Sequence, residues 1–385
     1  WVAHPDAVED FLRTGVTYNN NLSLSSGGES YNFRLGLSSR NTTRGVSPNS
    51  SMDRYQVRFN GSFDLAEDLS GTAVARYSDR SAKGRAGTGY EFANNPMAPF
   101  NTFTQRQLNY GPDSYMRDFA RPNGQQRGWN YSSIEGALGQ TSFEFTDNPY
   151  TTQFENFQSD SRRRIFGKAQ ISYDFIEDLS GQYQVTVDQF TERRKNRRAD
   201  ISSEDPSGFE EDVLEVQELN SEVRFNYDRQ LTEEFDLTAF TAGRVRYETF
   251  DRNRNETQNG LASPGVFNIE NSIGRPSVTD FNEEKIVYSV YGSASLGYND
   301  LAYLEGTLRN DWSSTLPEDN NSYLYPSVSA NLVFSSLNAL EGQDVLSFGK
   351  IRASWAQVGN DTDPYQISPS YPIGTPFQGQ PLLNL

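Results

Sequence analysis

The sequence contains no cysteine and only one histidine, His4, among its 385 residues. The lack of cysteine excludes disulfides and thiolate metal sites. A single histidine cannot form a histidine cluster, which nearly excludes zinc-protease and serine–histidine–aspartate chemistry. His4 itself is interpreted as an exposed polar residue. We therefore predict no metal site, no cofactor and no enzymatic activity.

Apolar residues are also scarce, at 35% of the chain, with a mean hydropathy of −0.72. This is little for the packed cores of the two or three soluble domains that such a length would suggest. No run of eighteen apolar residues occurs, so a transmembrane helix is excluded. No signal peptide is visible, which indicates a mature chain or one whose front is missing.

What the chain does contain is an alternation of apolar and polar residues in twelve segments. Because successive Cβ atoms of a strand point to opposite sides, such a strand has one apolar and one polar face. Each segment has about ten residues, the length that a tilted strand needs to cross a bilayer. The alternating apolar residues that mark these segments fall within 16–24, 31–37, 55–63, 69–77, 165–175, 179–187, 223–227, 235–245, 286–298, 304–308, 328–334 and 351–355.

The connections between these segments alternate strictly between short and long. The short turns lie near 26–30, 64–69, 174–180, 229–235, 298–301 and 335–345, and the long connections at 40–53, 79–162, 190–218, 249–284, 312–324 and after 358. Bacterial outer-membrane barrels have tight periplasmic turns, long outer loops, an apolar outside and a polar inside. We predict an all-β, antiparallel transmembrane β-barrel in the outer membrane of a Gram-negative bacterium.

Two features support the prediction that the short turns lie together at one end of the barrel. The turn at 64–71 is nearly copied at 174–181 and more loosely at 231–237, which indicates a recurring hairpin. Aromatic residues on the apolar parity lie beside the turns, where they would form an interfacial girdle; the alternative is ordinary strand ends in a soluble sandwich. The girdle residues are Phe63, Phe175, Tyr227, Phe235, Tyr298 and Phe334.

The net charge of −17 makes nucleic acid an improbable partner, and the charge is unevenly distributed. The short turns are acidic, whereas the opposite strand ends are basic. One hypothesis is a cationic rim that binds the phosphates of lipopolysaccharide. The alternative is a set of inward-pointing arginines that pair with acidic residues such as Glu204, Glu210 and Glu211. The candidate rim consists of Arg162, Arg163, Arg164, Arg193, Arg194 and Arg197.

Two stretches carry a family resemblance: 309–334, which begins Arg-Asn-Asp-Trp-Ser-Ser, and 351–365, which contains Gly-Asn-Asp-Thr-Asp-Pro-Tyr. Together with the entry region around 11–28, they closely resemble the barrel of SusC/RagA-type TonB-linked outer-membrane transporters of Bacteroidetes. The polar residues after 358 are interpreted structurally, as side chains that fix the base of a loop. A calcium site there is a minority interpretation.

The resemblance implies import of a glycan or peptide through a plugged barrel of about 22 strands, with a SusD-like surface lipoprotein as lid and TonB as energy source. Only about half of such a barrel is counted, and no plug or TonB-box segment is present. We expect a fragment or partial chain. Residues 1–15 would be a linker from the missing plug, 16–358 barrel strands with extracellular loops, and 359–385 an extracellular loop or tail.

The largest connection, 79–162, is rich in aromatic, amide and hydroxyl side chains, which suit the capture of sugar or peptide. The alternative is that the rings form the core of the loop itself. The candidate ligand or partner residues are Trp129, Tyr131, Tyr110 and Tyr115. Two other functions remain open from the sequence. A secreted soluble β-rich protein that binds or cleaves glycans would need no detergent, and a passive porin would need neither plug nor TonB.

Overall fold

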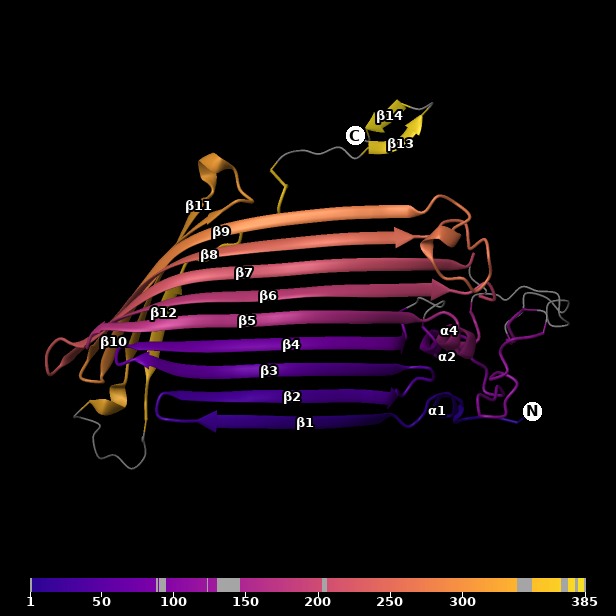
Figure 1. Ribbon diagram of the computed structural model, residues 1–385, viewed down its shortest axis with the longest axis horizontal. Helices are drawn as coiled ribbons and strands as arrows, with labels where there is room; N and C mark the ends of the chain where they lie inside the picture. Colours follow the sequence, from indigo (N-terminus) through magenta and orange to yellow (C-terminus); the bar gives the residue numbers. More distant parts are fainter. Residues whose placement is uncertain are drawn as a thin grey trace.

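Twelve strands form one antiparallel sheet in chain order, as a computed structural model shows (Figure 1). The structure describes the chain except residues 1, 88, 90–94, 123, 130–145, 203–205, 338–347, 368–372, 378–379 and 384–385. The strands are β1 (Val16–Gly27), β2 (Tyr31–Arg44), β3 (Ser51–Ala66), β4 (Leu69–Arg85), β5 (Gln158–Ile176), β6 (Leu179–Arg198), β7 (Gly208–Gln230), β8 (Phe235–Glu256), β9 (Ser277–Tyr298), β10 (Ala302–Ser313), β11 (Ser322–Leu332) and β12 (Ile351–Ala356).

Short helices lie in the connections, mostly at the long-connection end of the sheet. They are α1 (Ala7–Phe11), α2 (Met97–Thr102) and α4 (Pro149–Phe154), with 3₁₀ turns η1 (Ile269–Asn271), η2 (Glu318–Asn320) and η3 (Phe334–Ser336). In the described part of the chain, no helix combines the length and apolar character needed to cross a membrane.

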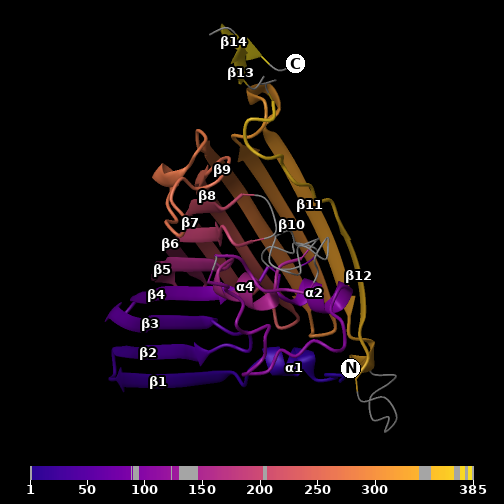
Figure 2. The ribbon, with the colours of Figure 1, turned by 90° about the vertical axis from the view of Figure 1, so that its right-hand side faces the viewer.

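The sheet is strongly curved, because β10–β12 turn back toward the first strands (Figure 2). The apolar residues of the alternating pattern lie on its convex face, and the polar residues lie on its concave face. Ile171, Val290 and Leu332 on the convex face are 51%, 54% and 38% exposed. A soluble sandwich would bury these side chains between two layers. The prediction of a barrel-type sheet with an apolar outside is therefore confirmed.

The near-copied turns fold into the same hairpin. Glu67 and Asp68 form the turn between the paired residues Ala66 and Leu69. Glu177 and Asp178 form the same turn between Ile176 and Leu179, with the same register shift just before each pair. The turns also hold neighbouring hairpins, since the amide of Asp174 donates to the carbonyl of Asp68 at 2.9 Å. The sequence repeat therefore marks a repeated corner at the short-turn end.

Aromatic rings pack beside these turns, as the girdle prediction requires. The rings of Phe235 and Tyr298 lie 4.9 Å apart, and those of Phe175 and Phe225 lie 6.2 Å apart. A Cβ atom on Gly181 would lie 2.7 Å from the ring of Phe175, so glycine is needed for the ring to lie across the strand. Phe334 differs, because it lies in the 3₁₀ turn η3 and not in a strand.

The strands are longer than the sequence pattern suggests. β7 has 23 residues, and β6, β8 and β9 have 20, 22 and 22, about twice what a bilayer requires. The predicted connections 190–218 and 249–284 shrink accordingly to 199–207 and 257–276. The extensions carry polar residues on both faces and have no consistent apolar face, so apolar alternation does not reveal them.

The tail after 358 is a further difference. In place of a loop alone, it contains a small separate hairpin, β13 (Ile373–Phe377) with β14 (Gln380–Leu383). The hairpin lies apart from the twelve-stranded sheet (Figure 1).

Candidate functional site in the lumen

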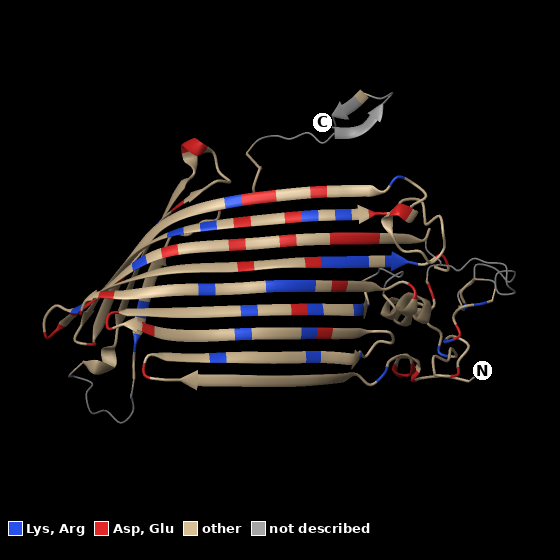
Figure 3. Cartoon of the chain, viewed as in Figure 1, with Lys and Arg blue, Asp and Glu red and all other residues tan. Residues whose placement is uncertain are grey.

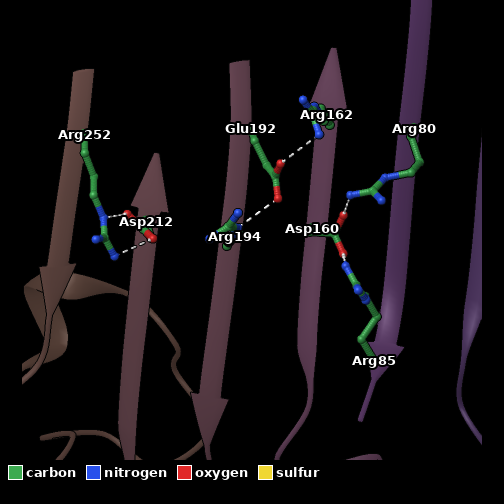
Figure 4. Close-up of polar contacts among 8 residues, drawn as sticks. All are labelled: Arg80, Arg85, Asp160, Arg162, Glu192, Arg194, Asp212 and Arg252. Atoms are coloured by element: carbon green, nitrogen blue, oxygen red, sulfur yellow. Dashed lines mark hydrogen bonds and ion pairs between the residues drawn. The ribbon is translucent and has the colours of Figure 1, made fainter. Parts of the chain in front are cut away.

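Three buried carboxylates lie on the concave face, toward the long-connection end. Asp160 is on β5, Glu192 on β6 and Asp212 on β7, with side chains only 5%, 9% and 5% exposed. Each of the three lies at a strand position that alternates with the outward-facing apolar residues, so each side chain points into the lumen. Burial of an unpaired carboxylate is costly, and arginines meet each of them (Figure 4).

Arginine guanidinium groups hold these carboxylates from the same and neighbouring strands. Asp160 lies between Arg80 and Arg85, with a distance of 2.7 Å from Nη1 of Arg85 to Oδ1. Arg252 binds Asp212 through two hydrogen bonds, at 2.9 and 3.0 Å. Such two-point contacts fix the direction of the guanidinium as well as its distance. This part of the lumen is therefore a rigid network of compensated charge.

The predicted cationic rim divides between the two faces. Arg162 and Arg194 both approach Glu192, at 3.7 and 2.8 Å, and Arg164 pairs with Asp188. These three arginines face the lumen, as the alternative of inward-pointing arginines predicts. Their partners are acidic strand residues on the same face, and not Glu210 or Glu211; Glu204 lies outside the described residues. They are not placed to contact lipid headgroups.

The other three rim arginines have the outward parity. Nε of Arg163 is 3.4 Å from Asp79, and Nε of Arg193 is 3.7 Å from Glu211. Arg197 instead donates to the backbone carbonyls of Glu155 and Phe154, each at 2.9 Å, and so ties the α4 segment to β6. Contact with lipopolysaccharide through Arg163 and Arg193 stays a prediction.

Reversing both charges, with Arg163→Glu and Arg193→Glu, is expected to reduce the lipopolysaccharide that copurifies with the full-length protein. Each exposed charge contact contributes about 0.2–1 kcal/mol, so the loss should be partial. Quantifying bound lipid A by mass spectrometry measures it. The Arg163→Lys, Arg193→Lys variant keeps the charge and is the control. Equal retention in both variants would reject the rim.

A cavity with a volume of about 880 Å³ lies along the concave face of β1–β5. We name its seven arginines the arginine wall. They are Arg34, Arg54, Arg58, Arg76, Arg80, Arg162 and Arg164. The remaining lining is mainly serine, asparagine and glutamine, so this surface suits a hydrated polar ligand.

The aromatic candidates of the 79–162 connection mostly form the core of that loop. Tyr110 is fully buried against Phe100, Phe11 and Tyr150, and the hydroxyl of Tyr150 donates to the carbonyl of Tyr110 at 2.5 Å. Burial raises the pKa of Tyr110 well above its ordinary value. Tyr110 is therefore inaccessible to a ligand in this structure. Phe11, from the expected linker, completes this core.

The other candidates differ in their accessibility. Trp129 packs edge-on against Tyr110, and its Nε1 donates to the carbonyl of Phe103 at 3.1 Å. Tyr115 is half exposed, beneath the guanidinium of Arg127. Tyr131 lies outside the described residues. A ligand role for these three stays a prediction. Of the two that the structure describes, Tyr115 presents its ring to solvent without packing into the core.

The two family-like stretches meet at the base of the loop after β12. Asp361 accepts hydrogen bonds from Nζ of Lys285 at 2.8 Å and from Oγ of Ser313 at 2.6 Å. Burial alone would raise the pKa of Asp361, but the hydrogen bonds and charge of Lys285 outweigh it and the pKa is lowered. The lysine ammonium occupies the place that a cation would take, so the motif serves as a loop anchor.

Sequence reasoning missed the acidic half of the luminal network. Asp160, Glu192 and Asp212 alternate with outward residues at the same two-residue period as the apolar segments. That period, continued outward past the apolar belt, assigns each of them to the lumen. The signal was therefore present, but it lay in segments interpreted as loops.

Comparisons with known proteins agree with this architecture. No family model matches the chain. TonB-dependent receptor P26 of Formosa agariphila is 23% identical over 363 residues, covering 91% of this chain and 33% of the relative. A structure of the RagAB peptide importer in the closed-closed state superposes with a TM-score of 0.75 at 17% identity, covering 99% of this chain and 41% of that one.

The open-open state of RagAB gives a TM-score of 0.72 at 16% identity, with 98% and 40% coverage. The chain has the barrel fold of a RagA-type transporter. The resemblance that the motifs indicated is thus confirmed, and it supports the predicted outer-membrane location. The chain spans about one third of the curated relative and two fifths of the RagAB chains. These relatives are receptors and transporters, which supports the prediction that the chain is not an enzyme.

Proposed function

We propose that this chain forms part of the barrel of a SusC-type, TonB-dependent importer that carries a glycan or peptide across the outer membrane. A SusD-like surface lipoprotein would act as its lid at the long-connection end. The superposition on RagAB, which is described as a peptide importer, supports a large organic cargo. The similarity to a TonB-dependent receptor supports energised uptake.

The observation that carries this proposal is the contrast between the two faces of one continuous sheet. The convex face presents exposed apolar side chains to lipid, whereas the concave face has buried ion pairs and a polar cavity of about 880 Å³. A conduit for hydrated cargo needs this arrangement. The cavity lies toward the upper end of the range for small-molecule pockets, about 300–1,000 Å³, so it would hold a short oligomer.

Uptake of fluorescent oligosaccharide and peptide libraries tests the proposal in cells that express the full-length protein. We expect accumulation that stops when TonB is depleted, because the energy would come from TonB. A SusD-like lipoprotein should copurify with the importer. Accumulation that is unchanged without TonB would instead identify a passive porin and contradict the proposal. Cells with the empty vector are the control.

A further inference from the structure

Four arginines stand directly opposite one another across four adjacent strands of the concave face. The register pairs Arg40 with Arg54, Arg54 with Arg80, and Arg80 with Arg162. A second row pairs Arg58 with Arg76. Like charges placed directly opposite in a sheet are destabilising. The basic bands of these rows lie on β2–β5 (Figure 3).

Among the residues that the structure describes, carboxylates compensate only one side of this arginine array. Arg80 and Arg162, at the β5 side, bind Asp160 and Glu192. Arg164, also on β5, pairs with Asp188. The other four wall arginines form no ion pair with any described residue, and their side chains are exposed. These are Arg34, Arg54, Arg58 and Arg76.

The contrast with β7 and β8 shows that the excess is local. There, luminal arginines are interleaved with carboxylates: Arg252 pairs with Asp212, and Arg254 with Glu210 and Glu256. The same face of the same sheet therefore balances its charge in one sector and leaves it positive in another. In a chain of net charge −17, this positive sector is a specific feature.

The geometry of the uncompensated sector defines the ligand that it fits. Neighbouring strands lie about 4.8 Å apart, and Arg54 and Arg58 are separated by about 13 Å along β3. A ligand that reaches both rows must carry several negative groups along an extended chain. The guanidinium fork matches carboxylates, as Arg252 and Asp212 show within the same lumen.

We propose that the uncompensated arginines Arg34, Arg54, Arg58 and Arg76 bind an extended oligocarboxylate cargo. The carboxylates would come from an acidic peptide or from a glycan built of uronic acids. The wall extends from the row of Arg54, Arg80 and Arg162, toward the long connections, to Arg34, near the short turn that precedes β2. It therefore lines the path that cargo would take under the proposed function. This inference rests on that function, because it names the chemistry of the imported molecule.

Binding measurements on the detergent-purified full-length protein test the proposal with four probes. Hexaglutamate and hexaglutamine form one matched pair, and hexagalacturonate and maltohexaose form the other. We expect the acidic member of at least one pair to bind about tenfold more tightly, and its affinity to fall as salt rises. Which acidic member binds distinguishes a peptide from a glycan source.

The triple variant Arg54→Gln, Arg58→Gln, Arg76→Gln should lose about tenfold or more in affinity for the acidic probe. A control that removes three cations elsewhere should bind like the parent. Its substitutions are Arg229→Gln, Arg275→Gln and Arg352→Gln.

Two results would overturn the inference. One is equal binding of acidic and neutral probes in both pairs. The other is a triple variant that unfolds at a lower temperature while the parent binds no acidic probe, since the wall would then hold another part of the same protein. If the acidic probes bind but TonB-dependent uptake fails, the proposed function is rejected and the arginine wall remains a carboxylate-binding site. If neutral cargo is taken up and no acidic probe binds, the proposed function stands and the inference about the wall is rejected.

Discussion

Replacing Ile171 with arginine should lower the free energy of unfolding of the full-length protein by about 2–4 kcal/mol, the cost of a cation at the lipid-facing midplane of a barrel. Ile171 lies on the convex face of β5, within its apolar belt, and is 51% exposed to what would be acyl chains. An arginine there must bring its charge into hydrocarbon or distort the bilayer to reach water.

The neighbouring residue supplies the control for this prediction. Gln170 lies next to Ile171 on β5 but faces the lumen, so Gln170→Arg should cost less than about 1 kcal/mol. Urea unfolding of the protein in liposomes, followed by heat-modifiable electrophoretic mobility, measures both. Equal costs would mean that lipid does not cover the convex face. A larger cost for Gln170→Arg would mean that the two faces had been exchanged.

The sequence pattern predicts the strands well where lipid enforces it. Hydrocarbon requires an apolar side chain at each second position, so residues such as Ile165 and Val290 reveal strand, face and order together. Outside the bilayer that requirement ends. The outer half of β7 alternates acidic and apolar residues without a consistent apolar face, and its strand is held by cross-strand pairs that only the register reveals.

The candidate site was harder to predict for a related reason. Arg162 and Arg163 are adjacent in sequence, so they read as one basic cluster, yet the pleat sends them to opposite faces. Tyr110 looked available for ligand because its partner Phe11 lies far away in the chain. Local spacing carries face information within a strand, but it does not show which distant segment covers a loop residue.

Replacing Asp160 with alanine should cost about 3–5 kcal/mol of stability, because it removes the shared partner of two guanidinium groups. The Asp160 carboxylate is 5% exposed and binds both Arg80 and Arg85. Without it, Arg80 would stand beside Arg54 and Arg162 with no opposing charge from β5. The loss should therefore come from repulsion as well as from the missing hydrogen bonds.

Two further variants separate these causes. Asp79→Ala breaks the exposed pair with Arg163 on the convex face and should cost less than about 1 kcal/mol. Asp160→Asn keeps the shape and an acceptor oxygen but removes the charge, so its cost measures repulsion within the arginine rows. High salt should recover part of that cost in both Asp160 variants, since it screens like charges. If Asp160→Ala and Asp79→Ala cost the same in urea unfolding, the buried carboxylate is not what holds the arginine rows together.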